Sequence, residues 1–193
     1  MKKGLIAVVV LVALGLLCLS KYNSLVNKEE AVTSAWSQVE NVYQRRADLI
    51  PNLVNTVKGY AAHEKSTLEA VVSARSRATQ ITVDPQNLTE EQLLKYQQTQ
   101  GELASALGKL LAITENYPEL KANENFMELQ HQLEGTENRI AVERKNFNEV
   151  AQDYNTTIRR FPTNIVASVC GFERKAYFQA QEGTEKAPEV SFE

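Results

Sequence analysis

The sequence predicts an all-α protein. An N-terminal transmembrane helix precedes an elongated antiparallel bundle of three long helices and a short C-terminal helix. Three observations carry this prediction: an uncharged apolar run near the start, apolar residues at heptad spacing over long stretches, and prolines at 85, 118 and 162 that separate those stretches. A chain of 193 residues fits one domain of ordinary size and leaves a remainder for an anchor.

The anchor is predicted over residues 4–20, GLIAVVVLVALGLLCLS, behind a short flank of residues 1–3. At 1.5 Å per residue this run reaches roughly 25 Å, near the lower limit for crossing the hydrocarbon core of a bilayer. An uncleaved anchor is favoured over a cleaved signal peptide, because leucines crowd the best match to a cleavage site near the end of the run. Attachment of a lipid to Cys18 is a third alternative, although Leu17 and Gly15 fit that pattern poorly.

The first bundle helix is predicted from about Val32 to about Ala78, nearly continuous with the anchor. Apolar residues recur there three and four apart, which is the spacing of one buried seam on a long helix. The seam contains Val32, Trp36, Val39, Tyr43, Arg46, Ile50, Leu53, Val57, Tyr60 and Val71. The stretch QITVDPQNL that follows reads as a loop because it holds β-branched residues and an Asp-Pro pair.

Two residues of this predicted helix require explanation. Pro51 lacks the N–H that would bond to Ala47, so we expect either a kink in a continuous helix or a new helix capped by Asp48. Arg46 lies on the seam itself. The sequence favours a guanidinium that reaches outward along its aliphatic stem. The alternative is a buried pair with a carboxylate of the third helix, either Glu137 or Glu143.

The second and third helices have clear boundaries. Thr89 with Gln92 three residues later predicts a capping box at the start of the second helix, which ends before Pro118. The third helix shows apolar residues at intervals of seven and closes before Pro162. Those residues are Phe126, Leu133, Ile140, Phe147, Tyr154 and Phe161.

A short helix ending at Gly171 follows, so the bundle is expected over residues 21–176. An extended or partly disordered tail is expected over residues 177–193.

Composition and motifs exclude several classes of function. The formal net charge is −3, and all acidic residues follow the apolar run, so a nucleic-acid-binding role is not expected. Cys18 and Cys170 are too far apart in the sequence to suggest a disulfide framework. A single E-x-x-H, Glu128 to His131, falls short of a di-iron motif. We therefore predict no enzymatic activity, no catalytic residues, no metal and no cofactor.

Two long blocks and the tail resemble the LemA family. They are WSQVENVYQRRADLIPNLVNTVKGYAAHE at 36–64, the stretch from Tyr117 to Ala167, and KAYFQAQEGTEKAPEVSF near the end. The resemblance implies a LemA-like four-helix bundle on a single anchor in a bacterial membrane. It supplies no catalytic or ligand-binding residues, because the family has no established activity.

The function predicted from these features is that of a membrane-anchored scaffold or adaptor with unknown protein partners. Homo-oligomers are possible, since heptad seams can also pack between chains. The basic residues beside the span favour a bundle on the periplasmic or extracellular side. The candidate interaction surface comprises Arg45, Arg46, Asp48, Pro51, Asn52, Asn55, Asn125, Glu134, Glu137, Asn138 and Arg139. A sensor of a small ligand or envelope component, with Tyr43, Tyr60 and Tyr154 around a polar gap, is the alternative.

Overall fold

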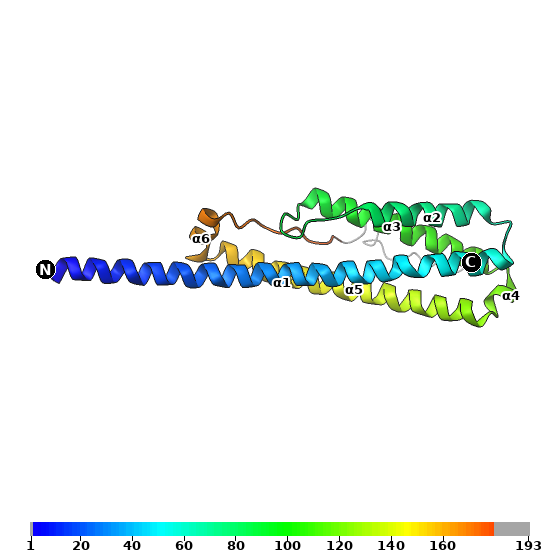
Figure 1. The fold of residues 1–193 in the computed structure, drawn as a ribbon, viewed down its shortest axis with the longest axis horizontal. Coiled ribbons are helices and arrows are strands. Elements are labelled where there is room, and N and C mark those ends of the chain that lie inside the picture. The colour runs from blue at the N-terminus through cyan, green and yellow to red at the C-terminus, as the bar shows by residue number, and fades with distance from the viewer. Residues whose placement is uncertain (1, 180–193) are drawn as a thin grey trace, which may run out of the picture.

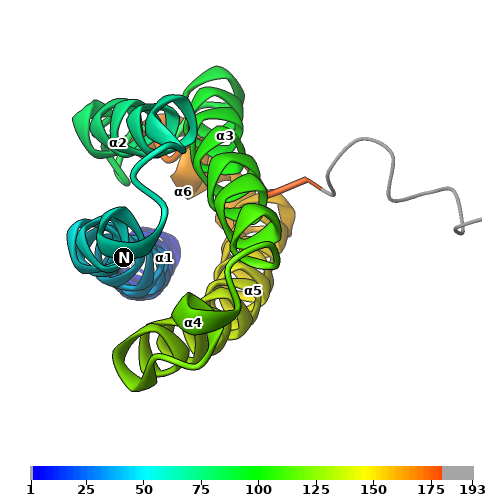
Figure 2. The same ribbon diagram turned by 90° about the vertical axis from the view of Figure 1, so that its right-hand side faces the viewer.

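A computed structural model describes residues 2–179 and shows an all-α rod, as the sequence predicts (Figure 1). Its helices run alternately up and down the rod, and α1 and α5 lie side by side. Seen along the rod, α2 packs next to α3 while α1 packs next to α5 and α2 (Figure 2). This arrangement buries the apolar seams of the four long helices against one another.

The first helix, α1, runs without interruption over Lys2–Tyr60, so the predicted anchor and the first bundle helix are continuous. Every residue from 2 to 20 is exposed, and Leu25 is the first fully buried side chain. This helix is long and apolar enough to cross a membrane, by length and composition. Pro51 lies inside α1, so the alternative of a new helix beginning at Asp48 is wrong.

The single helix expected from Val32 to Ala78 is in fact two helices. α1 ends at Tyr60, and α2, Lys65–Gln80, folds back alongside it. Tyr60, expected on the buried seam, is therefore 42% exposed, whereas Val71 is buried within α2. The heptad continues in phase across the reversal, which is why the sequence reads as one helix.

The second predicted helix is α3, Glu90–Thr114, and it carries the expected capping box between Thr89 and Gln92. A single turn, α4, Pro118–Lys121, connects it to α5, Glu124–Arg159.

Along α5 the heptad residues from Phe126 to Tyr154 are buried, but Phe161 lies beyond the helix end and is 81% exposed. The short helix α6, Thr163–Cys170, ends at Gly171, whose φ of 77° suits a residue without a Cβ.

The core consists of two clusters stacked along the rod. One contains Trp36 and Tyr43, reaches down to Leu25 and includes the first turns of α3. The other contains Ile50, Leu53, the seam of α2 and the later part of the α3 seam. Arg46 lies at the level where the two clusters meet. The extended residues after α6 return along the bundle and add Phe178 to the first cluster. Residues 180–193, which hold most of the predicted tail, lie outside the described residues.

Candidate interaction surface

The antiparallel pair α1 and α5 positions the predicted surface residues, six on α1 and five on α5. All of them are exposed except Arg46, which is buried and only 2% exposed. The exposed members are Arg45, Asp48, Pro51, Asn52, Asn55, Asn125, Glu134, Glu137, Asn138 and Arg139. Because the two helices run in opposite directions, the far end of the α1 set lies beside the beginning of the α5 set.

Asparagines from both helices line one open hollow of about 380 Å³. Asn52 and Asn55 reach it from α1, and Asn125 reaches it from α5. Thr56, Glu128 and Leu129 complete its lining. None of the three asparagine side chains hydrogen-bonds to another group within residues 2–179. The hollow therefore presents unused amide donors and acceptors, which can pair with the backbone of another chain.

Arg46 makes a buried pair instead of reaching outward, so the snorkelling expectation is wrong and its alternative is correct. Its Nη1 donates to Glu137 Oε1 at 2.8 Å. Its Nη2 donates to Gln100 Oε1 at 2.7 Å and to the Gln100 carbonyl at 3.0 Å. The guanidinium also lies 5.0 Å from the ring centre of Tyr43. Glu137 is half-exposed, so the pair is solvated on one side only.

This polar layer touches all four long helices. Gln100 of α3 connects the layer to α2, because its Nε2 donates to the carbonyl of Ala78 at 3.3 Å. Arg46 of α1 and Glu137 of α5 complete the set. A charged side chain on a heptad seam costs desolvation but specifies which residues face one another. Arg46 therefore helps to specify the register of the bundle and is not part of its exposed surface.

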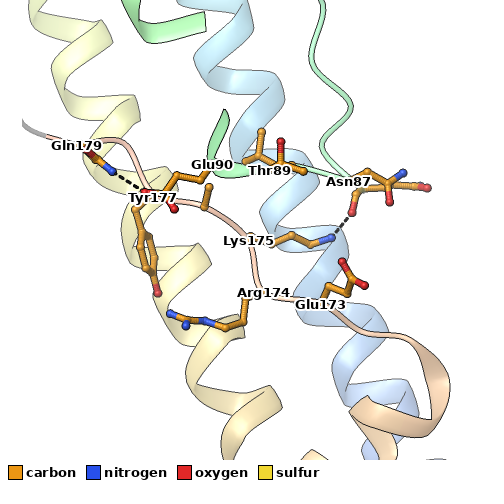
Figure 3. A pocket seen from close by; sticks show the side chains of 11 residues that line it. Asn87, Thr89, Glu90, Glu173, Arg174, Lys175, Tyr177 and Gln179 are labelled. Atoms are coloured by element: carbon orange, nitrogen blue, oxygen red, sulfur yellow. Dashed lines mark hydrogen bonds between the residues drawn. The ribbon is translucent and has the colours of Figure 1, made fainter. Parts of the chain in front are cut away.

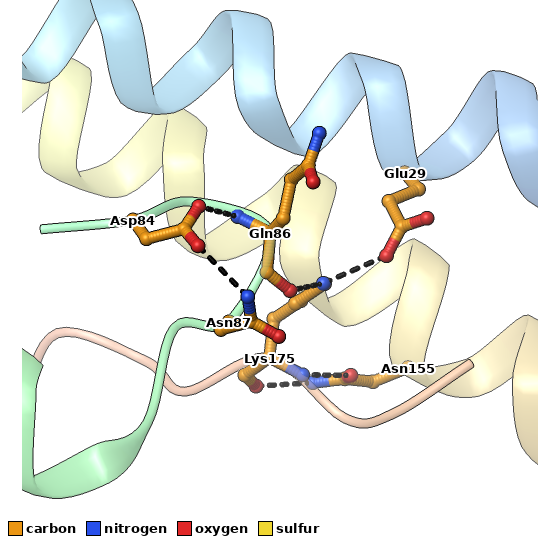
Figure 4. A network of polar contacts seen from close by, with 6 residues as sticks. All are labelled: Glu29, Asp84, Gln86, Asn87, Asn155 and Lys175. Atoms are coloured by element: carbon orange, nitrogen blue, oxygen red, sulfur yellow. Dashed lines mark hydrogen bonds and ion pairs between the residues drawn. The ribbon is translucent and has the colours of Figure 1, made fainter. Parts of the chain in front are cut away.

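Lys175 is the centre of a second set of buried polar contacts (Figure 4). This set lies closer to the N-terminus of α1 than the Arg46 layer does, because it includes Glu29. Lys175 is 4% exposed. Its Nζ pairs with Glu29 of α1 at 2.7 Å and donates to the carbonyl of Gln86 in the α2–α3 loop. The ammonium lies 5.6 Å from the ring centre of Tyr154. The carbonyl, the carboxylate and the aromatic face together replace the water that the charge loses.

The extended segment 172–179 is held by amide side chains that bind its backbone. Asn155 accepts from the N–H of Lys175 at 2.9 Å and donates to its carbonyl at 2.8 Å. Asn148 binds Phe178 in the same two-bond manner at 2.8 and 2.9 Å. Gln97 does so with Gln179, at 2.9 and 3.3 Å. A segment without a neighbouring strand thereby satisfies its backbone.

Beside this segment lies a hollow of about 560 Å³, bounded by residues 86–90, residues 173–177 and Gln179 (Figure 3). Neither this hollow nor the amides that bind the backbone were predicted from the sequence. One signal was available: Asn148 and Asn155 are seven apart and each follows a heptad aromatic, Phe147 or Tyr154. Residues seven apart share one face of a helix, so this repeat places both amides on the same side of α5.

The tyrosines of the predicted ligand gap are not gathered in one place. Tyr43 borders a hollow of about 260 Å³ that neither Tyr60 nor Tyr154 lines. Tyr154 is packed within the core, and Tyr60 accepts a hydrogen bond from Asn123 at the opposite end of the rod. Within residues 2–179, no three His, Cys, Asp or Glu side chains are grouped as metal ligands.

The fold and site define a class: an all-α bundle on a long N-terminal helix that is apolar enough to span a membrane. The model of the LemA family matches residues 35–192, and the chain belongs to this family. It is 30% identical to magnetosome protein MamQ 2 of Paramagnetospirillum magneticum, over 90% of this chain and 70% of the relative.

A second relative is protein LemA of Metamycoplasma hominis. It is 29% identical to this chain, over 83% of this chain and 69% of the relative. Neither the family description nor these names denote an enzyme.

Proposed function

We propose that this LemA-family protein is a membrane-anchored scaffold or adaptor that acts through protein–protein contacts. The observation that carries the proposal is the hollow between α1 and α5, where Asn52, Asn55 and Asn125 hold unused amide groups. Buried polar groups in a folded protein find partners, whereas exposed ones on a rigid scaffold remain available to a ligand. Two packed helices hold the backbone positions from which these amides project.

Two other asparagines of the chain support an inference about what such amides bind. Asn148 and Asn155 also lie on α5, and each binds both backbone groups of one residue in an extended segment. Asn125 is near the start of the same helix. We therefore infer that the partner presents an extended or irregular backbone to the hollow, with little demand on its side chains.

The anchor is proposed to be uncleaved and to cross the membrane once. The basic residues beside the span favour an orientation that puts the bundle on the periplasmic or extracellular side. Paired C-terminal reporters, each active on one side of the membrane, test this in intact cells. A signal from the external reporter alone is expected. A signal from the cytoplasmic reporter alone would place the bundle inside and direct the search to cytoplasmic partners.

Site-specific photocrosslinking in cells tests the contact surface. A photoreactive residue at Asn55 or at Asn125 is expected to give an adduct with the same partner. Lys109, exposed on α3, is the control position and should not give that adduct. Replacing Asn52 by Arg should abolish the adduct without changing the unfolding temperature. An adduct pattern that is equal at all three positions would reject this surface.

A further inference from the structure

The short helix α6 lies where α1 changes from apolar to polar. Tyr22 of α1 contacts Phe172, just after α6, with ring centres 5.7 Å apart. Ala167 of α6 is buried in the same cluster as Leu25. Figure 1 shows α6 beside α1, just after the N-terminal part of α1 that extends beyond the bundle. This end of the bundle is the base from which the apolar helix emerges.

The level of α6 matches the headgroup region of a bilayer. The apolar run ends at Ser20, so Tyr22 and Leu25 lie roughly 3 to 8 Å beyond it along the helix. The headgroup region on each side of the hydrocarbon core is roughly 5 to 8 Å thick. If residues 4–20 cross the membrane, the base of the bundle is at the lipid surface.

Three large apolar side chains project from this base. Phe161 is 81% exposed, Ile165 56% and Val169 82%. Ile165 and Val169 are four apart and share one face of α6, opposite to the side that buries Ala167. Within the described residues these are among the most exposed large apolar side chains outside the anchor itself. Exposed apolar residues grouped on one element indicate a contact surface.

The charge of the base fits an anionic surface. Arg159 and Arg160 directly precede Phe161, and Lys21 follows the apolar run. None of the three forms an ion pair within residues 2–179. The stretch 154–172 contains no acidic residue, although the whole chain is net negative. Basic residues beside an apolar face are the combination that binds membranes with anionic lipids.

We propose that Phe161, Ile165 and Val169 insert into the lipid headgroup region beside the anchor, while Arg159 and Arg160 contact anionic headgroups. This inference rests on the proposed membrane anchor. Such docking gives the rod a second attachment to the membrane and restricts its tilt, so that the hollow between α1 and α5 is held away from the lipid.

Fluorophore labelling of the full-length protein in nanodiscs of phosphatidylcholine and phosphatidylglycerol tests the proposal. The Val169→Cys and Ile165→Cys variants, made in a Cys18→Ser, Cys170→Ser background, place a label on the docking face. Val142→Cys is the matched control, because Val142 is 61% exposed on α5 in the middle of the bundle. A label on native Cys18, with Cys170→Ser, reports insertion of the anchor.

Nitroxide-bearing lipids are expected to quench the labels at 165 and 169, and aqueous iodide quenching is expected to be lost there but kept at 142. Replacing Arg159 and Arg160 together by Gln should lower the ratio of docked to undocked protein by about thirtyfold in anionic nanodiscs. Unchanged circular dichroism shows that each variant is folded.

Equal iodide access at 142 and 169, with Cys18 protected, would overturn the docking while leaving the anchor intact. An exposed Cys18 label would overturn the anchor and the docking together.

Discussion

The Nε of Arg75 donates to the carbonyl oxygen of Ala47 at 2.7 Å, and this carbonyl is the one that Pro51 leaves without a helical partner. In a regular helix the N–H of residue 51 would bond to Ala47. Proline has no N–H, and Ala47 is a core residue that is only 3% exposed. Without another donor, the carbonyl of Ala47 would therefore be buried and unpaired. A side chain of α2 supplies the missing donor, which lets α1 continue through its proline.

Arg75→Ala should destabilise the protein by about 2 kcal/mol, the contribution of a hydrogen bond from a charged donor. In a Pro51→Ala background the helix supplies its own donor to Ala47, so the same substitution should cost less. Urea unfolding of the four proteins in this cycle measures the coupling between Arg75 and Pro51. Arg77→Ala is the control, because the exposed Arg77–Glu102 pair should contribute less than about 1 kcal/mol. Additive costs in the cycle would contradict the relationship.

Arg46→Ala should lower the free energy of unfolding by about 3 kcal/mol or more. The substitution leaves a cavity and removes the donor that satisfies the buried Gln100 oxygens. Arg46→Met should cost less, because it retains most of the volume. Arg45→Ala, which truncates the exposed neighbour, is the control for chemical denaturation. A loss below about 0.5 kcal/mol for Arg46→Ala would mean that the pair adds nothing to the bundle.

Local and periodic signals made most of the fold predictable. The capping box at Thr89, the left-handed residue at Gly171 and the heptad of α5 each depend on a few neighbouring residues. The reversal between Tyr60 and Lys65 was missed because the heptad continues across it without a proline. Phe161 was wrongly placed on the heptad of the third helix, because its spacing of seven continues past the end of α5.

The candidate site was only partly predictable because its contacts join distant segments. The seam position of Arg46 suggested a buried pair only as the alternative to an outward-reaching side chain, and it left Glu137 and Glu143 both open as the partner. The donor to Ala47 and the acceptors of Lys175 could not be predicted, because Arg75, Glu29 and Gln86 reach them only through the packing of separate elements. Amino-acid type alone did not separate these three from solvated polar residues.

Phe178→Ala should release the extended segment from the bundle. Phe178 stacks on Trp36 with ring centres 5.9 Å apart and contacts Phe147 at 5.5 Å. Trp36 is the single tryptophan, so its emission should shift to the red when water replaces the ring. Trypsin should cleave after Lys175 faster than in the parent, because Lys175 is buried there.

Phe161→Ala is the control for this experiment, since it removes an exposed ring from the base of the bundle. It should change neither the emission nor the cleavage rate. Unchanged emission in the Phe178→Ala protein would show that the segment does not pack against Trp36 in solution.

Stability should fall at alkaline pH because buried tyrosines resist ionisation in the folded state. Burial raises the pKa of Tyr96 well above its ordinary value of 10.0, and the negative charges of Tyr43 and Glu40 would raise it further. Burial, followed by the charge of Glu29, raises the pKa of Tyr154. Above pH 10 the unfolded chain therefore loses protons that the folded protein keeps. The stabilisation is complete below that pH and is lost as the pH rises.

Each such tyrosine should contribute a slope of up to about 1.4 kcal/mol per pH unit above its ordinary pKa. Tyr96→Phe and Tyr154→Phe should each make the decline shallower, and together their effects should add, because neither tyrosine contributes to the pKa shift of the other. Urea unfolding in detergent micelles at a series of pH values from about 9 to about 11 measures the slope. An equally steep decline in the double variant would assign the alkaline loss of stability to other groups.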